Sequence, residues 1–483
     1  MGVLLGLRPE PVFHYFEEIC GIPHTSHHEK ALSDYCVRFA KERGYECIQD
    51  EMGNVIIIAE ATPGYEAVPA VILQGHLDMV GDKAAGCDID MEREGPRVYV
   101  DGDFLRADGT TLGADNGIAV AYMLALLDAK DNSIPHPRLE VVLTVCEEVG
   151  LLGASAMDFY PCRARRMINI DSEVEGILTA GCAGGRRSRC HIPVKRILRT
   201  GLLCKLELVG LLGGHSGMEI DKGRANGAML LGRFLMHLKE TLSYDLVNFA
   251  AGAKENVIPK SGSAVLLIPA EEESHLRKVM EKFLDCMEAE YGKADPDIRL
   301  ELTVGKTGEF PVLDRVSLGR VLTALNLMPN GVQAMSMDLP GLVETSINMG
   351  VAELVEDELI IRQSIRSSVS SAKEMISKKV TLLAEQLGGE VDFQGDYPAW
   401  PYARNSKLRD LCVEVFKRQY GHEPKIELMH AGLECGIISG KLEGLDCISF
   451  GPSQFDIHTP NEHVSISSAA RVWEYLKAIL AEK

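Results

Sequence analysis

Apolar positions along the chain follow two spacings, and these spacings predict where strands and helices lie. Continuous apolar runs at 55–59 and 71–73 predict strands that are covered on both faces. Further strand-like segments are 139–145 and 167–170. Apolar residues three and four apart predict helices at 11–20, 29–43 and 117–128. This alternation predicts an α/β domain of three layers with a mostly parallel central sheet.

The pattern changes between residues 186 and 394. Strand-like segments there alternate with long amphipathic helices, which predicts a separate α+β domain. The strands are expected at 204–209, 264–268, 299–304 and 359–365, and the helices at 225–240, 272–290 and 372–387. After residue 407 the α/β pattern resumes, with helices at 407–419 and 465–480 and a strand at 445–450.

The resumption predicts that one domain is inserted into the other. The discontinuous domain is expected to comprise residues 1–185 and 395–483, and the inserted one residues 186–394. The Gly-Gly pair at 184–185 and the stretch 395–401, which contains one glycine and two prolines, are the expected hinges.

Composition narrows the possible partners and the compartment. With 50 basic and 70 acidic residues the formal charge is −20, which disfavours binding to nucleic acid. No apolar run approaches the ~18 residues that cross a bilayer, and residues 1–10 lack the apolar core of a signal peptide. The 13 cysteines contain no C-x-x-C pair, which is typical of reduced thiols in the cytoplasm. A cytoplasmic protein that binds neither membrane nor nucleic acid is expected.

Five segments place metal-ligating residue types where predicted strands or loops end. In open α/β sheets such positions meet at the rim where ligands bind. The candidate ligands are His76, Asp115, Glu148, Asp171 and His458. This mixture of nitrogen and oxygen donors suits Zn²⁺, Mn²⁺ or Co²⁺.

The number of candidates indicates how many metals are bound. One catalytic zinc needs three protein ligands, whereas five ligands with a shared carboxylate suit two ions ~3.5–4 Å apart. Glu147 is then left over beside Glu148, and adjacent residues in an extended segment point apart. One of the two can bind metal while the other acts as general base. Asp78, two residues after His76, is placed to accept the second imidazole N–H and fix its tautomer.

Four stretches carry a resemblance to a known family. They are Thr110-Thr-Leu-Gly-Ala-Asp-Asn-Gly-Ile118, Gly181-Cys-Ala-Gly-Gly185, Gly213-Gly-His-Ser-Gly217 and His430-Ala-Gly-Leu-Glu-Cys-Gly436. Over essentially its whole length the chain resembles the di-zinc metallopeptidases, which include aminoacylases, carboxypeptidases and carnosinase-like dipeptidases. Within that family, the four stretches together are most similar to a dipeptidase.

The resemblance implies a role for each candidate ligand. His76 and Asp171 would hold one zinc ion, and Glu148 and His458 the other. Asp115 would bridge the two ions. Glu147 would be the general acid and base, and Asp78 would orient His76.

The resemblance also implies that the inserted domain is a lid that contributes to the site and forms a homodimer. His215 would stabilise the oxyanion of the tetrahedral intermediate. Asn256 would lie near the substrate, and Arg366 would bind its C-terminal carboxylate. Neither the residues nor the resemblance assigns a role to His430 or Glu434.

The predicted function is therefore metal-dependent hydrolysis of short peptides with a free C-terminal carboxylate, Xaa-His dipeptides among them. One alternative is an aminoacylase or carboxypeptidase of the same family. Another is a protein that captures peptides without hydrolysing them. The presence of Glu147 beside Glu148 disfavours the second alternative, because a mere binding protein needs no spare general base.

Overall fold

The computed structural model describes residues 2–129 and 133–483. The chain divides into two compact units. The first comprises Met1–Cys182, Trp400–Leu428 and Leu433–Lys483, and the second comprises Ala183–Ala399 and Met429–Gly432. The glycines expected as hinges lie inside strands of the second unit. The four residues Met429–Gly432 return to that unit after the chain has re-entered the first.

The first unit is built on a sheet that contains eight strands of the described chain. In spatial order they are β1 (Glu46–Gln49), β2 (Val55–Ala59), β6 (Leu139–Thr144), β3 (Val71–His76), β7 (Arg166–Asn169), β21 (Asp446–Ser449), β8 (Ile177–Cys182) and β20 (Lys425–Met429). The central neighbours β6, β3, β7 and β21 pair in parallel. The pairs β1–β2, β2–β6 and β21–β8 are antiparallel. The central strands β6 and β3 are fully buried, as the apolar runs predict.

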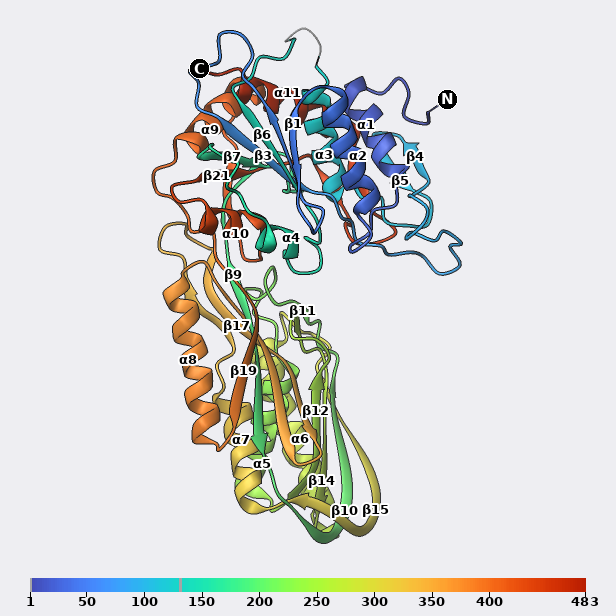
Figure 1. Cartoon of the computed structure of the whole chain (residues 1–483). Coiled ribbons are helices and arrows are strands. Elements are labelled where there is room, and N and C mark those ends of the chain that lie inside the picture. Colours follow the sequence, from blue (N-terminus) through green and yellow to red (C-terminus); the bar gives the residue numbers. More distant parts are fainter. Residues whose placement is uncertain (1, 130–132) are drawn as a thin grey trace. The chain divides into compact units, whose positions relative to one another are not determined.

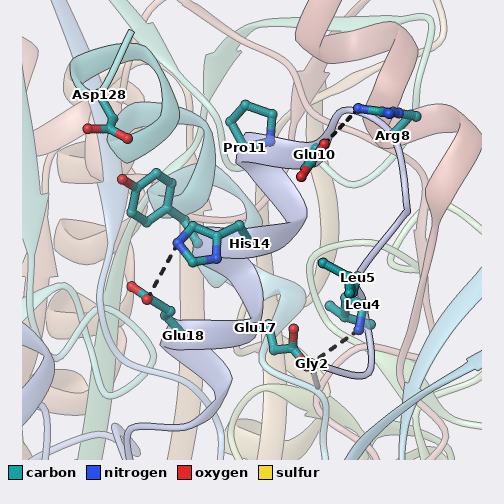
Figure 2. Close-up of a pocket in the computed structure, with 11 residues that line it drawn as sticks. Gly2, Leu4, Leu5, Arg8, Glu10, Pro11, His14, Glu17, Glu18 and Asp128 are labelled. Carbon is teal, nitrogen blue, oxygen red and sulfur yellow. Dashed lines mark hydrogen bonds and ion pairs between the residues drawn. The ribbon is translucent and has the colours of Figure 1, made fainter. Parts of the chain in front are cut away.

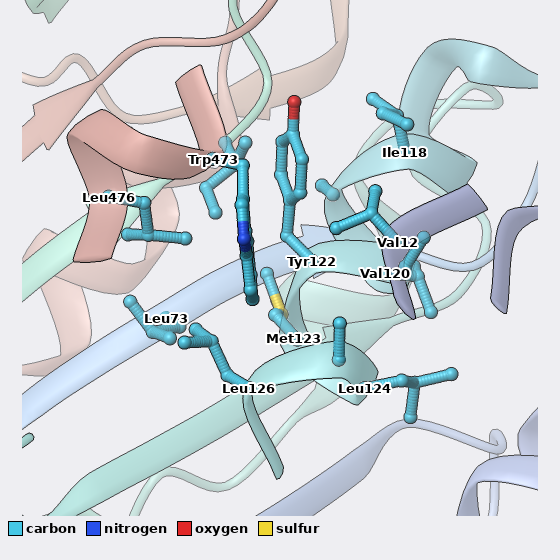
Figure 3. Close-up of a cluster of buried hydrophobic side chains, with 14 of the residues drawn as sticks. Val12, Leu73, Ile118, Val120, Tyr122, Met123, Leu124, Leu126, Trp473 and Leu476 are labelled. Carbon is cyan, nitrogen blue, oxygen red and sulfur yellow. The ribbon is translucent and has the colours of Figure 1, made fainter. Parts of the chain in front are cut away.

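Helices cover both faces of this sheet (Figure 1). One face packs with α1 (Glu10–Cys20), α2 (Lys30–Glu42), α3 (Ala114–Leu127), α9 (Lys407–Tyr420) and α11 (Ile466–Leu480) in a single hydrophobic core. The short helices α4 (Leu152–Ala156) and α10 (Glu434–Lys441) contact each other, and α10 lies against β8 and β21. In the main core, Tyr122 of α3 stacks on Trp473 of α11 and Leu73 of β3 lies beneath them (Figure 3). The three-layer α/β prediction is confirmed.

A smaller sheet of the first unit presents the last candidate ligand. Its strands are β22 (Gln454–Phe455), β23 (His463–Ser465), β5 (Phe104–Ala107) and β4 (Val98–Asp101). Strands β22 and β23 pair antiparallel, so residues 456–462 form the connection between them. His458 and Glu462 both lie in this connection.

The second unit is an α+β domain around an antiparallel sheet. In order its strands are β15 (Arg299–Leu313), β10 (Arg196–Val209), β14 (Gly262–Ile268), β12 (Asp245–Gly252), β17 (Val343–Val355), β18 (Glu358–Ser367), β9 (Gly184–Pro193) and β19 (Glu390–Tyr397), with β16 (Gly331–Met335) also paired to β17. Its helices are α5 (Gly227–Thr241), α6 (Glu273–Tyr291), α7 (Arg315–Leu327) and α8 (Ser370–Gln386). A separate ladder joins β11 (Gly214–His215) to β13 (Val257–Ile258). Across the described residues, no helix has the length and apolar character that spanning a bilayer requires.

Candidate functional site

The parallel strands of the first unit bring three candidate segments to one edge of the sheet. His76 at the end of β3 pairs with Thr144 at the end of β6, and Gln74 pairs with Asn169 at the end of β7. The chain positions that follow these strand ends carry Glu147, Glu148 and Asp171. This is the arrangement expected from strand ends that meet at one rim of an α/β sheet.

Asp115 lies between two groups of donors. Its Oδ1 is 3.1 Å from Nε2 of His76, which is 3.4 Å from Oδ1 of Asp171. Its Oδ2 is 3.2 Å from Nε2 of His458, which is 2.8 Å from Oε1 of Glu148. Donor atoms of each group lie within 4.8 Å of one another, close enough to hold a metal ion. The structure thus brings all five candidate ligands together, with one Asp115 oxygen facing each group.

Glu147 adjoins the same donors. A carboxylate oxygen of Glu147, one of Glu148 and an imidazole nitrogen of His76 also lie within 4.8 Å of one another. Both glutamates follow the buried strand β6 and point into the cluster rather than into solvent. Distances alone therefore leave open which glutamate binds metal and which moves protons.

Asp78 holds this region through both its backbone and its side chain. Its backbone carbonyl is 2.9 Å from Nδ1 of His76, whereas its carboxylate Oδ1 is 3.6 Å from that nitrogen. The carboxylate accepts the backbone N–H groups of Glu147 and Glu148, at 2.9 and 3.2 Å. Asp78 therefore links the β3 end to the glutamate pair, and its closest contact with His76 is through the main chain.

The crowding of acids shifts their proton affinities. Burial raises the pKa of Glu147 well above its usual range, and the nearby Asp171 carboxylate raises it further. Burial also raises the pKa of Asp171, to about 6. For Asp115 burial acts in the same direction, but hydrogen bonds from His458 and His76 outweigh it and lower the pKa. Such buried carboxylates need cationic partners, and the set fits divalent metal ions.

Glu462 is a buried residue for which the sequence analysis predicts no role. Its Oε2 accepts the backbone N–H groups of Leu112 and Gly113, and its Oε1 accepts those of Ala114 and Asp115, at 2.8–3.3 Å. One carboxylate thus binds four consecutive N–H groups, those of residues 112–115, where the chain enters α3. Because Glu462 follows His458 by four residues, it joins the segments of two candidate ligands.

Asn116 makes a second such link. Its Oδ1 accepts the backbone N–H of His76, and its Nδ2 donates to Oδ1 of Asp171 at 3.0 Å and to the carbonyl of Ile170. The side chain next to Asp115 therefore ties three ligand segments together. No local sequence signal marks this role, because an asparagine before a helix is usually solvated, whereas here the fold buries Asn116.

Glu434 is the first residue of α10 and is fully buried. Its Oε2 accepts hydrogen bonds from Gln74 of β3 and Thr144 of β6. Burial raises its pKa to about 7. The residue supports β3 and β6, the two strands that lead into candidate ligands. Among the described residues, its side chain makes no hydrogen bond to those ligands.

The second unit has its own polar cluster, which contains His215. Nδ1 of His215 accepts the backbone N–H groups of Gly217 and Met218, at 3.3 and 3.2 Å. The ring proton therefore lies on Nε2, which leaves that atom as a donor. Burial, followed by the positive charge of Arg366, lowers the pKa of His215, so the ring is neutral near pH 7.

Arg366 of β18 is buried with an exposed fraction of 8%. Its Nη1 donates to the hydroxyl of Tyr397 at 3.2 Å, while its Nε has no hydrogen-bond partner among the described residues. A Cβ at Gly217 would lie 3.2 Å from this Nε and 3.1 Å from Cε1 of His215, so glycine permits their close approach. A buried guanidinium with a free donor is suited to an anionic ligand.

Asn256 and His430 lie near this cluster. Asn256 is exposed, and its backbone carbonyl accepts the N–H of Ser216, beside the β11–β13 ladder. Nε2 of His430 is 2.7 Å from Oγ of Ser346, which pairs with Arg366 across β17 and β18. Burial, and then the charge of Arg366, lower the pKa of His430 to about 4. His430 is therefore a neutral neighbour of Arg366 at physiological pH.

The first unit also has a cavity that lies away from the candidate ligands. It has a volume of about 870 Å³ and is lined by the N-terminal segment, helix α1 and Asp128 (Figure 2). Its polar side chains include Arg8, which pairs with Glu10 at 2.8 Å, and His14, which is 3.5 Å from Glu18. No candidate ligand lines this cavity, so its size alone does not make it the functional site.

Comparisons with known proteins agree with this site. Two family models match, Peptidase family M20/M25/M40 over residues 245–482 and Peptidase family M28 over residues 54–172. The cytosol non-specific dipeptidase of Escherichia coli (strain K12) is 36% identical over 484 residues, which cover 100% of this chain and 99% of the relative.

Solved structures extend the comparison. Aminoacylhistidine dipeptidase from Vibrio alginolyticus superposes with a TM-score of 0.91 at 37% identity, over 98% of this chain and 97% of that one. The aminopeptidase PepT from Bacillus cereus ATCC 10987 shares the fold, with a TM-score of 0.58 at 16% identity over 98% of each chain.

The fold and the clustered His and carboxylate donors define a metallohydrolase type of site. The chain belongs to the peptidase family M20/M25/M40. The resemblance noted in the sequence is thereby confirmed.

The Glu462 contacts give a test of how Asp115 is positioned. Glu462→Ala would leave four N–H donors at the start of α3 without their acceptor, so Asp115 should lose its fixed orientation. We expect the affinity for divalent metal to fall by about 10–100-fold, as when other residues that orient ligands are removed. Calorimetric titration of the metal-free protein measures this.

Glu423→Ala is the control, because Glu423 is an exposed glutamate of the same unit that pairs only with Lys417 among the described residues. Unchanged metal affinity in a folded Glu462→Ala protein would show that Glu462 does not position Asp115.

Proposed function

We propose that this protein is a metal-dependent dipeptidase that hydrolyses dipeptides with a free C-terminal carboxylate, Xaa-His dipeptides included. The observation that carries the proposal is Asp115, whose two oxygens face two separate groups of donors. The E. coli and Vibrio relatives are both named dipeptidases, which supports the same substrate class.

We infer two divalent ions per chain, with Zn²⁺ as first choice and Mn²⁺ or Co²⁺ as substitutes. His76 and Asp171 would hold one ion, Glu148 and His458 the other, and Asp115 would bridge them. When bound, the ions would supply Lewis acidity toward the scissile carbonyl and a water nucleophile at neutral pH.

Glu147 is assigned the proton transfers. It lies among the donors, and its raised pKa suits a group that accepts a proton from water and later delivers it to the leaving amine. The Asp78 carboxylate would hold the Glu147 backbone in place, and the Asp78 carbonyl would keep the Nδ1 proton on His76.

The second unit would recognise the rest of the substrate. The free Nε donor of buried Arg366 supports a bidentate contact with the C-terminal carboxylate. His215, neutral and protonated on Nε2, would donate to the developing oxyanion. Asn256, beside the His215 loop, would contact the substrate.

Other properties remain predictions. A homodimer formed through the second unit is expected from the family resemblance alone. A cytoplasmic location is supported by thirteen free cysteines, most of them buried, and by the name of the E. coli relative. An aminoacylase or carboxypeptidase specificity stays the alternative that a substrate panel has to exclude.

The first test combines metal removal with such a panel. We expect treatment with a chelator to abolish hydrolysis of Xaa-His dipeptides, and added Zn²⁺, Mn²⁺ or Co²⁺ to restore it. The reason is that a bound cation is needed to activate the attacking water at neutral pH. Metal analysis and initial rates on dipeptides, carnosine and N-acyl amino acids measure this. Full activity at a metal content well below one ion per chain would refute the proposal. A preference for N-acyl amino acids would favour the aminoacylase alternative.

The second test separates the two glutamates. Glu147→Gln should retain its metal and bind dipeptide, while kcat falls by at least about 10²–10⁴-fold, the usual contribution of a general acid and base. The neighbouring Glu148→Gln variant is the matched comparison and should lose metal instead. Metal analysis with steady-state kinetics distinguishes them, and the opposite pattern would exchange the two roles.

The third test addresses Arg366. An amidated dipeptide lacks the carboxylate that pairs with the guanidinium, so the normal enzyme should hydrolyse it much more slowly than the acid. Arg366→Ala should largely abolish this difference in kcat/KM. Arg362→Ala is the control, because Arg362 lies on the same strand and pairs with Glu353. Equal rates on acid and amide with the unmodified enzyme would show that Arg366 does not bind the carboxylate.

A further inference from the structure

A second cavity of the first unit opens directly beside the candidate metal centre. It has a volume of about 650 Å³ and is lined by Thr25–His28, Met79–Gly81, Lys83, Asp90–Glu92 and the pair Glu148–Val149. We call it the methionine pocket. Glu148 lines this pocket and is also a candidate ligand, so the pocket adjoins the metal centre.

Hydrogen bonds attach the walls of the methionine pocket to the metal centre. Oγ of Ser26 donates to Oδ2 of Asp78 at 2.8 Å, and the Ser26 N–H donates to the carbonyl of Met79. The adjoining Val80 is held by Thr111, whose hydroxyl donates to the Val80 carbonyl at 2.6 Å. The pocket is thus a fixed part of the unit that carries the ligands, rather than a gap between loose loops.

The floor and the charged lining of the pocket differ in chemistry. Met79 and Met91 are buried and pack with Ile89 in a small hydrophobic cluster of their own. Methionine side chains adapt to groups of different shape, so such a floor accepts many apolar side chains. The charged side chains that line the pocket are those of Asp90, Glu92, Glu148 and Lys83, so three carboxylates stand against one ammonium group and the net charge is negative.

The proposed function leaves the side chain of the first residue of the substrate without a binding site. It assigns the C-terminal carboxylate to Arg366 and the scissile carbonyl to the metal donors, but it assigns nothing to the side chain of the first residue. We propose that the methionine pocket binds this side chain, and that it favours long uncharged ones such as Leu and Met while disfavouring acidic ones. This inference rests on the proposed function, and it adds the preference for the residue before the scissile bond.

The volume and the charge of the pocket support this choice of occupant. A cavity of this size is within the ordinary range for sites of small ligands, so it has room for any single side chain. A Gly residue would leave the apolar floor in contact with water, whereas Leu or Met would bury against it. A Glu side chain would approach Asp90, Glu92 and Glu148, and Gln has nearly the same shape without the charge.

The experiment compares Gly-His, Leu-His, Met-His, Gln-His and Glu-His with the metal-loaded enzyme. The unmodified enzyme should show higher kcat/KM for Leu-His and Met-His than for Gly-His, and higher for Gln-His than for Glu-His. Val80→Phe narrows the pocket and should lower the ratio of kcat/KM for Leu-His to that for Gly-His by about 10-fold or more, mainly through KM. Met91→Ala removes part of the floor and should lower the same ratio without filling the pocket.

Two controls keep the result interpretable. Val100→Phe places the same substitution on exposed strand β4, outside the pocket, and should leave the ratio unchanged. Asp90→Asn combined with Glu92→Gln should narrow the gap between Gln-His and Glu-His. Circular dichroism and metal content show whether each variant is folded and loaded.

The outcomes separate the two proposals. If the unmodified enzyme hydrolyses none of these dipeptides, the proposed function is wrong. If it hydrolyses them but both Val80→Phe and Met91→Ala leave the Leu-His to Gly-His ratio unchanged, the proposed function stands and the methionine pocket does not bind the first side chain. The same conclusion follows if Glu-His and Gln-His are hydrolysed equally well.

Discussion

The rest of the site depends on a single carboxylate, that of Asp115, which presents one oxygen to each of two histidines. Such an arrangement fails if the carboxylate rotates, because both groups of donors would then lose their shared member. The chain fixes it from two sides. Glu462 binds the N–H groups of residues 112–115, where the chain enters α3, and the Asn116 side chain joins the segments of His76 and Asp171. Buried polar groups that are fully hydrogen-bonded specify one geometry, and this network does so around Asp115.

The parallel centre of the first sheet supplies the remaining geometry. Strands β3, β6 and β7 end at one edge in register, so His76, the glutamate pair and Asp171 need only short extensions to reach Asp115. Strands β3 and β6 are fully buried, and Glu434 accepts hydrogen bonds from Gln74 of β3 and Thr144 of β6. A metal centre in this position therefore rests on buried, hydrogen-bonded strands at the centre of the sheet.

The second unit contains a complementary kind of chemistry. Its cluster has a buried cation, Arg366, and two histidines that this cation and burial keep neutral. A neutral ring donates a hydrogen bond without adding a second positive charge, so Arg366 is the main positive charge of this cluster. The site in the first unit is therefore rich in carboxylates, whereas the cluster in the second unit consists of Arg366 and two neutral histidines.

The sequence predicted the fold class and the family because each leaves a local signal. Apolar runs such as 55–59 mark buried strands, and His76 or Glu148 follows such a strand at once. Glu462 and Asn116 gave no such signal, since a glutamate in a loop and an asparagine before a helix are usually solvated. Their partners are main-chain groups far away in sequence, which only the fold brings together. The placement of His430 in the second unit depends on a four-residue excursion of the chain that no composition change marks.

The most direct test of the central claim is anomalous X-ray scattering from crystals of the zinc-loaded protein, measured on both sides of the zinc edge. Two peaks are expected, one beside His76 and Asp171 and one beside His458 and Glu148, about 3.5–4 Å apart with the Asp115 carboxylate between them. A single peak, or two peaks that do not share Asp115, would contradict the dinuclear centre on which the proposed chemistry rests.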